Sequence, residues 1–449
     1  RGIPASGCRD WPQPALSADL LEAMAPAESI ALHMMDRMDS GNSFSHEERR
    51  RHFHHLLRYW LGVIQRCKPD LIVFSIAPHI VYDYVLYALA NHLGIQTAMF
   101  ERIGLPGWVY PIRQIFDLPS TMHPHSQPRQ VPLNPAFADY LRRSSLGGHT
   151  AVPPNFQKKL TRFKLDKNSN PGLLAGLWFE TRRAAYTLKR YGLGPVTNTY
   201  IKLANRPLRQ FPTAIDMTLV RLKGLLRKRR LKQRLVQFWQ PVDLSRPYVF
   251  LALHYQPERA TVPMGGMLGD QTLIVDIIAK ALPPDWLLYV KEHPWQLQPF
   301  SRGEMQRNDA FYEQIASHAN VRLVDPALTT PALIEQARAV ATVTGSAGWQ
   351  ALCRGIPALI FGAAWYRSCP GAHCIRSVAE AKAAFATSRQ PSADATEAFL
   401  RQVQSSCIPG TLEPAVEHVE RPDISHFASS MTLALTDLVS NRRQSAHHD

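Results

Sequence analysis

A strand, a turn, a helix and a second strand follow one another in residues 339–361, whose sequence is AVATVTGSAGWQALCRGIPALIF. The two end segments are short apolar runs, which are typical of strands buried on both faces of a parallel sheet. Between them, the turn 344–348 opens a helix. Because parallel strands need such a crossover helix, the stretch predicts one unit of a doubly wound α/β sheet.

The same alternation extends upstream of this stretch. Three further apolar runs, each followed by a helical pattern, lie at 248–253, 286–290 and 321–324. This regularity predicts a doubly wound parallel sheet. Downstream of residue 378 the sequence is helical, with breaks at Pro391, Pro409 and Pro422.

A second α/β unit is predicted near the N-terminus, where apolar runs at 70–75 and 96–100 flank a helical pattern at 82–93. Residues 118–160 are rich in Pro and Ser and predict a loop or linker. We expect a Rossmann-like domain over 1–150 and a basic helical insertion or linker over 151–240. A second Rossmann-like domain over 241–380 and a helical tail over 381–449 follow.

The basic charge of the chain is concentrated in one segment. The 449 residues carry 51 Lys and Arg and 36 Asp and Glu, for a net charge of +15. Residues 202–234 hold 11 of the basic residues and one acid, Asp216, and the remainder holds 40 basic and 35 acidic residues, for +5. A polyanion-binding surface over the whole chain is therefore excluded.

This basic segment allows three interpretations: a solvated helix, a nucleic-acid contact, or attachment to an anionic membrane surface. Phe211 is its one aromatic residue, which disfavours nucleic acid. A helix with leucines on one face and Lys and Arg on the other is typical of peripheral membrane proteins, so membrane contact is favoured and a solvated face stays open. The leucines are Leu222, Leu225, Leu226 and Leu231.

Six cysteines in 449 residues do not form a dense disulfide pattern and predict a cytoplasmic protein. Cys369 and Cys374 flank His373, but no second ligand pair accompanies them, so we expect a loop and no metal. No apolar stretch reaches the roughly 20 residues of a membrane span. The chain begins at Arg1 without an apolar signal region, which suggests a trimmed or partial N-terminus.

Loops that follow the strands are the expected place for chemistry, because open α/β sheets bind ligands at the carboxyl ends of their strands. The turn Gly345-Ser-Ala-Gly348 opens a helix and offers backbone N–H groups and a hydroxyl to a phosphate. The same residues also suit a tight turn in which Ser346 merely caps the helix, and both interpretations stay open.

Two more loops follow neighbouring strands. In Lys291-Glu-His-Pro294, Pro294 ends the strand and His293 can donate a hydrogen bond to a phosphate oxygen. His254 and Gln256 occupy the equivalent place on the next strand, and Glu258 could accept from a sugar or a base.

The ordered motifs resemble the capsule and surface-polysaccharide biosynthesis family, which includes bacterial Kdo transferases with two Rossmann domains. The resemblance is firm over about 248–366 and looser over 70–101, where it includes Pro78-His79. The firm motifs are His254-Tyr-Gln-Pro-Glu258, Asp270-Gln271, Lys291-Glu-His-Pro294, Gly345-Ser-Ala-Gly-Trp-Gln-Ala-Leu352, Gly355-Ile-Pro357 and Phe361-Gly-x-x-Trp-Tyr366.

The resemblance implies a GT-B-like fold, in which an N-terminal acceptor and catalytic domain faces a C-terminal nucleotide-sugar domain across a cleft. It implies a glycosyltransferase that moves an acidic sugar, Kdo first, from CMP to a capsular or other cell-surface polysaccharide or its lipid-linked primer. It places phosphate contacts on His293 and Ser346. The expected donor-binding residues are His254, Gln256, Glu258, Lys291, His293, Pro294, Gly345, Ser346, Ala347, Gly348 and Gln350.

One residue departs from the family pattern, since members usually carry Glu where Gln350 stands. Gln can still bond a ribose hydroxyl but carries no charge. Two alternatives therefore stay open: a CDP-polyol phosphotransferase of similar architecture, or a non-catalytic nucleotide-binding subunit of a polysaccharide assembly or export complex.

The catalytic group is expected on the N-terminal domain, because the nucleotide occupies the other side of the cleft. The candidates are Asp36, His79 and Glu101, and a carboxylate could act as a general base or as a nucleophile. For Asp36, an ion pair with Arg37 or a solvated helix face is the favoured alternative. Since the leaving group is a monophosphate, no metal and no cofactor beyond the donor are expected, and we expect a cytoplasmic protein at the inner membrane face.

Overall fold

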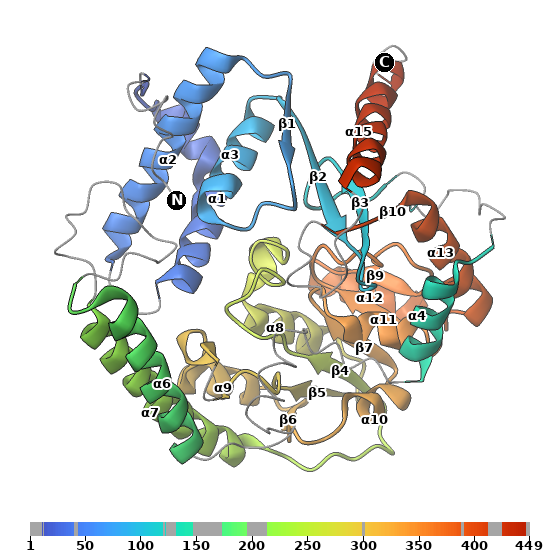
Figure 1. Cartoon of the computed structure of the whole chain (residues 1–449). Coiled ribbons are helices and arrows are strands. Elements are labelled where there is room, and N and C mark those ends of the chain that lie inside the picture. Colours follow the sequence, from blue (N-terminus) through green and yellow to red (C-terminus); the bar gives the residue numbers. More distant parts are fainter. Residues whose placement is uncertain are drawn as a thin grey trace.

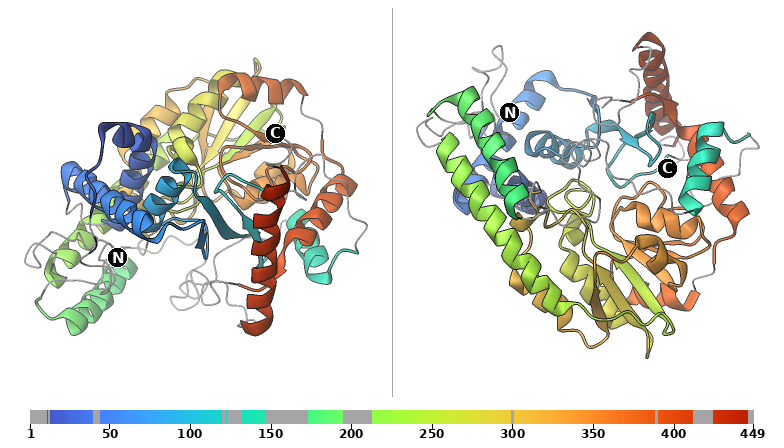
Figure 2. Two further views of the ribbon diagram at one scale, coloured as in Figure 1. Left: turned by 90° about the horizontal axis from the view of Figure 1, so that it is seen from above. Right: turned by 60° about the horizontal axis from the view of Figure 1, so that its bottom comes forward.

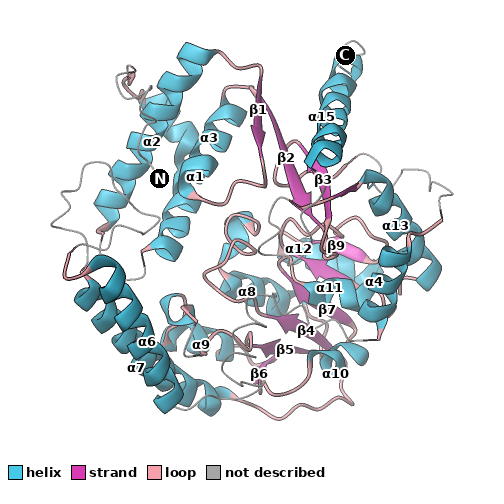
Figure 3. Ribbon diagram, viewed as in Figure 1, coloured by secondary structure: helices cyan, strands magenta, loops and turns pink. Residues whose placement is uncertain are grey.

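Two β-sheets and the helices around them make up the computed structural model of the chain (Figures 1 and 3). The predicted α/β class, with two α/β units, is confirmed. The predicted boundary near residue 150 lies outside the described residues. The structure describes residues 11, 13–39, 44–119, 122, 132–146, 173–194, 213–298, 301–387, 390–411 and 424–445.

The larger sheet is parallel throughout and has the strand order β6-β5-β4-β7-β8-β9. Its first five strands along the chain are the apolar runs predicted from the sequence. The sixth, β9, was not predicted. They are β4 (Tyr248–Ala252), β5 (Leu287–Lys291), β6 (Val321–Val324), β7 (Ala339–Thr342), β8 (Ala358–Ile360) and β9 (Ala372–Cys374).

Helices cover both faces of this sheet because successive side chains of a strand point to opposite sides. Val249 and Leu251 pack in one apolar cluster, and Tyr248 and Phe250 pack in another. The first face is covered by α7 (Ala214–Phe238), α8 (Gln271–Ala281), α9 (Asp309–Ala316) and α12 (Val378–Thr387), and the second by α10 (Thr330–Glu335) and α11 (Ser346–Leu352). Two short 3₁₀ turns, η4 (Gly266–Gly269) and η5 (Gly303–Met305), lie in the loops.

The smaller sheet has the order β1-β2-β3-β10 and contains the predicted strand-helix-strand unit. β1 and β2 are parallel, whereas β3 and β10 are antiparallel additions that were not predicted. Its elements are β1 (Leu71–Phe74), α3 (Val81–His92), β2 (Gln96–Arg102), β3 (Trp108–Ile112) and β10 (Ile408–Pro409), with α1 (Ala18–Met38) and α2 (His46–Cys67) packed on α3.

The prediction of a loop over 118–160 is wrong for part of that range, because α4 (Pro135–Ser145) is a helix. Asn134 caps it by accepting a hydrogen bond from Ala136 N, and Pro135 lies in its first turn. Phe137, Tyr140 and Ser144 recur at helical spacing and are buried. Tyr140 stacks on Trp349 of α11, so α4 packs on the second domain.

The helical tail returns to the first domain. α13 (Ala393–Ser406) packs on α4, β10 pairs with β3, and α15 (Ile424–Ser445) lies against both strands. In Figure 1 the red helix α15 stands beside β2 and β3, far along the chain from them. The two domains are thus joined by two crossing segments of chain.

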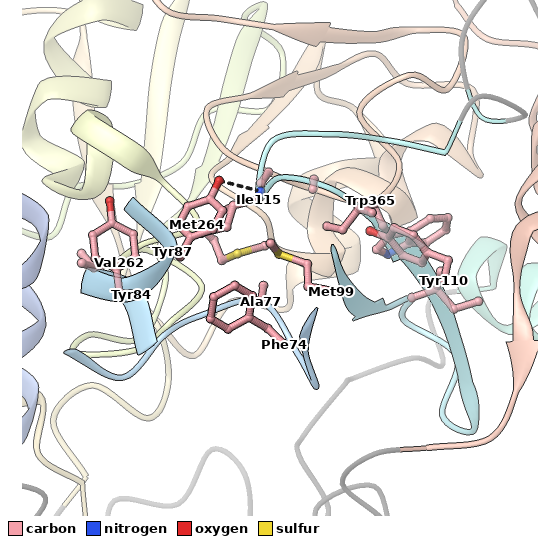
Figure 4. Close-up of a cluster of buried hydrophobic side chains, with 14 of the residues drawn as sticks. Phe74, Ala77, Tyr84, Tyr87, Met99, Tyr110, Ile115, Val262, Met264 and Trp365 are labelled. Carbon is pink, nitrogen blue, oxygen red and sulfur yellow. Dashed lines mark hydrogen bonds between the residues drawn. The ribbon is translucent and has the colours of Figure 1, made fainter. Parts of the chain in front are cut away.

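One apolar core spans both domains (Figure 4). Phe74, Tyr87 and Met99 of the first domain pack in the same cluster as Val262 and Met264 of the second. Where these side chains meet, the domain boundary is dry, so polar groups must find partners there or lie beside the core.

The basic segment includes α7, which lies beside α6 (Leu173–Tyr191) along one edge of the molecule in Figures 1 and 2. Leu225 and Leu231 are buried whereas Leu226 is 60% exposed, so the prediction that the four leucines form one face for a membrane is wrong. Residues 202–212 lie outside the described residues. No helix in the described part of the chain is long and apolar enough to cross a membrane.

Candidate functional site

Three loops with polar side chains lie close together at the carboxyl edge of the larger sheet. They follow β5, β4 and β7, which are adjacent in the strand order β5-β4-β7. The sequence placed His293, His254 and Ser346 in these loops, and the topology brings the loops together as expected.

His254 holds the Gly-Ser turn. Its Nε2 accepts hydrogen bonds from Thr344 N at 3.1 Å and from the Thr342 hydroxyl at 3.0 Å. Thr342 Oγ1 in turn accepts from Gly345 N at 3.0 Å. Because Nε2 is the acceptor, the neutral ring carries its proton on Nδ1. Burial lowers the pKa of His254 to about 4, so the ring is neutral at pH 7.

His293 faces a pocket of about 260 Å³ at the ends of β5 and β6. Its Nδ1 accepts a hydrogen bond from Trp295 N at 3.2 Å, which leaves Nε2 to carry the proton. Burial, with the nearby His254, Arg307 and Lys291, lowers its pKa to about 3. His293 is therefore a neutral N–H donor. The pocket is lined by Lys232, Leu235, Trp239, Glu292, His293, Pro294, Leu297, Gln298, Asp325, Pro326 and Ala327.

Lys291 points to a neighbouring loop. Its ammonium donates to Leu328 O and, at 3.2 Å, to Thr330 Oγ1, and burial lowers its pKa to about 8. It ties the loop after β6 to the end of β5. The predicted contact of Lys291 with the nucleotide donor stays a prediction. Pro294, which was also predicted to bind the donor, lines the pocket.

A buried polar layer lies behind the strand ends. Gln256 accepts from Gln271 Nε2 at 2.9 Å and from Arg307 Nη1 at 2.8 Å, and its Nε2 donates to Gly269 O. The fully buried Arg307 pairs with Glu292 at 2.7 Å. Because these buried groups are hydrogen-bonded to one another, the layer holds the loops in place. The hydrogen bonds of Gln256 therefore have a structural role.

The Gly-Ser segment is a tight turn as expected, but Ser346 does not cap the helix, because Gly345 is the N-cap of α11 and no side chain caps it. The phosphate contact of this turn stays a prediction. An added Cβ on Gly345 would lie 2.7 Å from Thr342 Oγ1, and one on Gly348 would lie 2.5 Å from Tyr366 Oη, so both glycines are needed for packing. Gly348 N donates to Gly345 O at 3.2 Å. Ser346 is exposed, and no described group bonds its N–H or that of Ala347.

Gln350 lies on α11 and is buried, with 6% of its surface exposed. Its neighbour Trp349 donates from Nε1 to Ser144 Oγ at 3.1 Å, which anchors α11 to α4. α11 therefore has its N-terminal turn at the strand ends and its body against the first domain.

Carboxylates and arginines meet at the domain boundary. Glu101 of β2 accepts from Arg259 Nη2 at 2.5 and 2.6 Å and is only 3% exposed. Glu258 is half-buried and lines a small cavity with Arg37. Burial raises the pKa of Glu258, and Arg259, Arg37 and Arg102 oppose that rise.

The other two predicted catalytic residues also lie in the first domain. His79 Nδ1 lies 3.0 Å from Ala77 O, and Arg37 donates to the carbonyl of His79. Asp36 pairs with Arg49, a different arginine from the predicted Arg37, and its side chain is 39% exposed. The partner of Asp36 thus belongs to α2. The catalytic roles of His79 and Asp36 stay predictions.

Several charged residues at the site were missed by sequence reasoning. Arg37, Arg259 and Arg307 are far apart in the sequence. No regular spacing along a helix or strand identifies them as parts of one site. Lys232 belongs to α7, which the sequence placed in a separate insertion. Arg259 alone had a signal, because it directly follows the His254–Glu258 motif.

The low pKa of His254 makes folding sensitive to acid. Between pH 6.5 and 4 the unfolded chain binds a proton at this residue that the folded protein excludes, so stability falls as pH falls. From pH 7.5 to 5, this residue should cost roughly 2 kcal/mol of unfolding free energy. His254→Gln keeps an acceptor near Nε2 and should show a shallower loss, measured by urea unfolding at both pH values. An equal loss in both proteins would contradict the assignment.

A family and several solved structures resemble this chain. Residues 258–408 match the sequence model of the family described as capsule polysaccharide biosynthesis protein. A search of curated proteins found no match. Two of the similar structures are Thermosulfurimonas dismutans KpsC transferases. The beta Kdo 2,7 transferase is 14% identical (TM-score 0.26), with 45% of this chain and 61% of that chain covered. The beta Kdo 2,4 transferase is 12% identical (TM-score 0.31), with 78% and 85% covered.

A third is the UDP-GlcNAc 2-epimerase from Methanocaldococcus jannaschii, at 14% identity and a TM-score of 0.27, with 81% of this chain and 84% of that chain covered. TM-scores this low do not establish a common fold, so the fold is assigned from the two sheets themselves. The family match begins at Glu258, includes the His293 and Gly-Ser loops, and ends at Ile408, the first residue of β10. Residues 258–408, about a third of the chain, are thus similar to the capsule polysaccharide biosynthesis family, in agreement with the sequence resemblance.

Proposed function

We propose that the protein is a glycosyltransferase that moves an acidic sugar, with Kdo the first candidate, from a CMP donor to a capsular or other cell-surface glycan. The observation that supports this most is the His293 pocket, in which a neutral imidazole N–H and Lys232 line about 260 Å³ at the strand ends. A pocket of this size suits a small ligand such as a nucleoside monophosphate. The family match covers the loop that carries His293.

The phosphate would accept from His293 Nε2, and the free N–H groups of Ser346 and Ala347 would face the sugar end of the donor. A neutral donor suits this place, because its hydrogen bond does not depend on pH in the physiological range. The proposed reaction uses no cofactor beyond the donor.

We assign the proton-accepting carboxylate to Glu258. It borders the cavity with Arg37, it is half-buried, and its raised pKa brings it closer to the working pH of a general base. Glu101 is covered by its ion pair with Arg259, so it would position Arg259 beside Glu258.

The α6–α7 pair supports contact with an anionic membrane surface. On α6, Trp178, Arg182, Tyr186 and Arg190 recur every four residues, and Trp178 and Tyr186 are 49% and 61% exposed. On α7, Ile215, Leu219 and Leu226 form an exposed apolar stripe near Lys223. Aromatic and aliphatic residues interleaved with cations that form no ion pair within the described residues match the chemistry of an anionic lipid surface.

The donor site is tested by His293→Ala. The variant should lose the rise in melting temperature that saturating CMP gives the wild-type protein, because the phosphate loses its donor. His92→Ala, an exposed histidine on α3, is the matched control and should keep the full rise. A full rise in His293→Ala would remove the proposed site.

The reaction is tested by CMP release from CMP-Kdo, with CDP-glycerol as the competing donor. Glu258→Gln should slow release at least about a hundredfold while CMP still binds, since a general base contributes about that much. Glu101→Gln should cause a smaller loss. The reverse order would assign the base to Glu101, and CMP binding without release from either donor would favour a non-catalytic subunit.

The membrane contact is tested with phosphatidylcholine vesicles that do or do not contain phosphatidylglycerol. Trp178→Ser combined with Lys223→Gln should weaken binding to the anionic vesicles by at least about tenfold, because a surface cation alone contributes about 1 kcal/mol. Leu433→Ser on α15, 65% exposed, is the control. Unchanged binding of the double variant would remove this contact.

A further inference from the structure

One wall of the His293 pocket comes from the basic helix. Lys232, Leu235 and Trp239, on α7 and just after it, face the loops that follow β5 and β6. α7 thus brings a cation to the donor pocket from a segment that precedes the larger sheet in the chain.

Most of the other cations of α7 have partners in the second domain. Lys228 is buried and donates to Ser301 O at 2.9 Å, and Arg230 pairs with Asp309 at 3.1 Å. Arg234 pairs with Glu313 at 3.3 Å. Lys232 is half-buried, and no described carboxylate lies within ion-pair distance of its ammonium. Burial lowers its pKa, against the opposing effect of Asp325.

The two carboxylates that line the pocket accept hydrogen bonds from groups other than Lys232. Glu292 accepts from Arg307, from Tyr312 Oη at 2.9 Å and from His293 N at 2.7 Å, so both of its oxygens are engaged. Asp325 Oδ1 accepts from Ala327 N at 2.8 Å. The positive charge of Lys232 is therefore not cancelled by Glu292, and it is only partly offset by Asp325.

Trp239 adds a second feature that points to a ligand. Its Nε1 is buried, and no described group accepts its hydrogen. A buried N–H without an acceptor costs free energy, which a bound acceptor would recover. The pocket wall from α7 thus offers a cation, an unsatisfied N–H and an aromatic surface.

We propose that Lys232 is a donor-binding residue, whose ammonium binds the nucleotide phosphate opposite His293 while Trp239 borders the nucleoside. This assignment rests on the proposed function, since it names a further residue of the same donor site. It makes α7 part of the nucleotide pocket and not merely a connection between domains.

The test compares Lys232→Gln with Arg229→Gln, which removes an exposed charge from the same helix. Binding of CMP and of cytidine is measured by calorimetry in the full chain. Lys232→Gln should weaken CMP binding about tenfold, as one charge-assisted hydrogen bond does, and leave cytidine binding unchanged. Arg229→Gln should bind both like the wild-type protein.

The outcomes separate this inference from the proposed function. If wild-type protein binds CMP and Lys232→Gln binds it equally well, Lys232 is not a donor ligand, although the donor site stands. An equal loss for CMP and cytidine would show that the substitution distorts the pocket and would also overturn the phosphate contact. Wild-type protein that binds neither CMP nor CDP would overturn the nucleotide site and Lys232 together.

Discussion

The apolar core shared by the two domains determines how the rest of the structure is arranged. Residues from β1, α3 and β2 pack against Val262, Met264 and Trp365 in one continuous cluster (Figure 4). Water is excluded there, so each polar group near the core needs a partner inside the protein. Glu101 with Arg259, and Trp349 Nε1 with Ser144, are two such pairs across the boundary. Glu258 and Arg37 lie at the edge of this core, in a small cavity that Met34 and Val262 also line.

A similar constraint acts within the second domain. The buried layer of Gln256, Gln271, Gln296, Arg307 and Glu292 is internally bonded, and it holds the loops after β4 and β5 in place. His254 extends this control to the loop after β7. A well-bonded support of this kind holds His293 and the start of α11 in fixed positions at the strand ends.

The strands of the larger sheet were predictable because each is a short apolar run bounded by a turn. β3 and β10 were missed because each contains a proline, Pro111 or Pro409, and because β10 is only two residues long and pairs with the distant β3. The site loops were also predictable, since their motifs follow strand ends. The direction of each side chain was not: Lys291 reaches the loop after β6, and Lys232 enters the pocket from a helix whose sequence indicates only charge. Such contacts depend on tertiary packing, which a local pattern does not contain.

The return of β10 and α15 to the first domain limits how the domains can move. The chain crosses the boundary once between the two sheets and again before β10, and β10 is hydrogen-bonded into the smaller sheet. A body held at two points can rotate about the line that joins them, but it cannot twist freely about any other axis. Motion of one domain against the other is therefore expected to follow a single arc, along which the boundary between Glu101 and Arg259 would open and close in one direction.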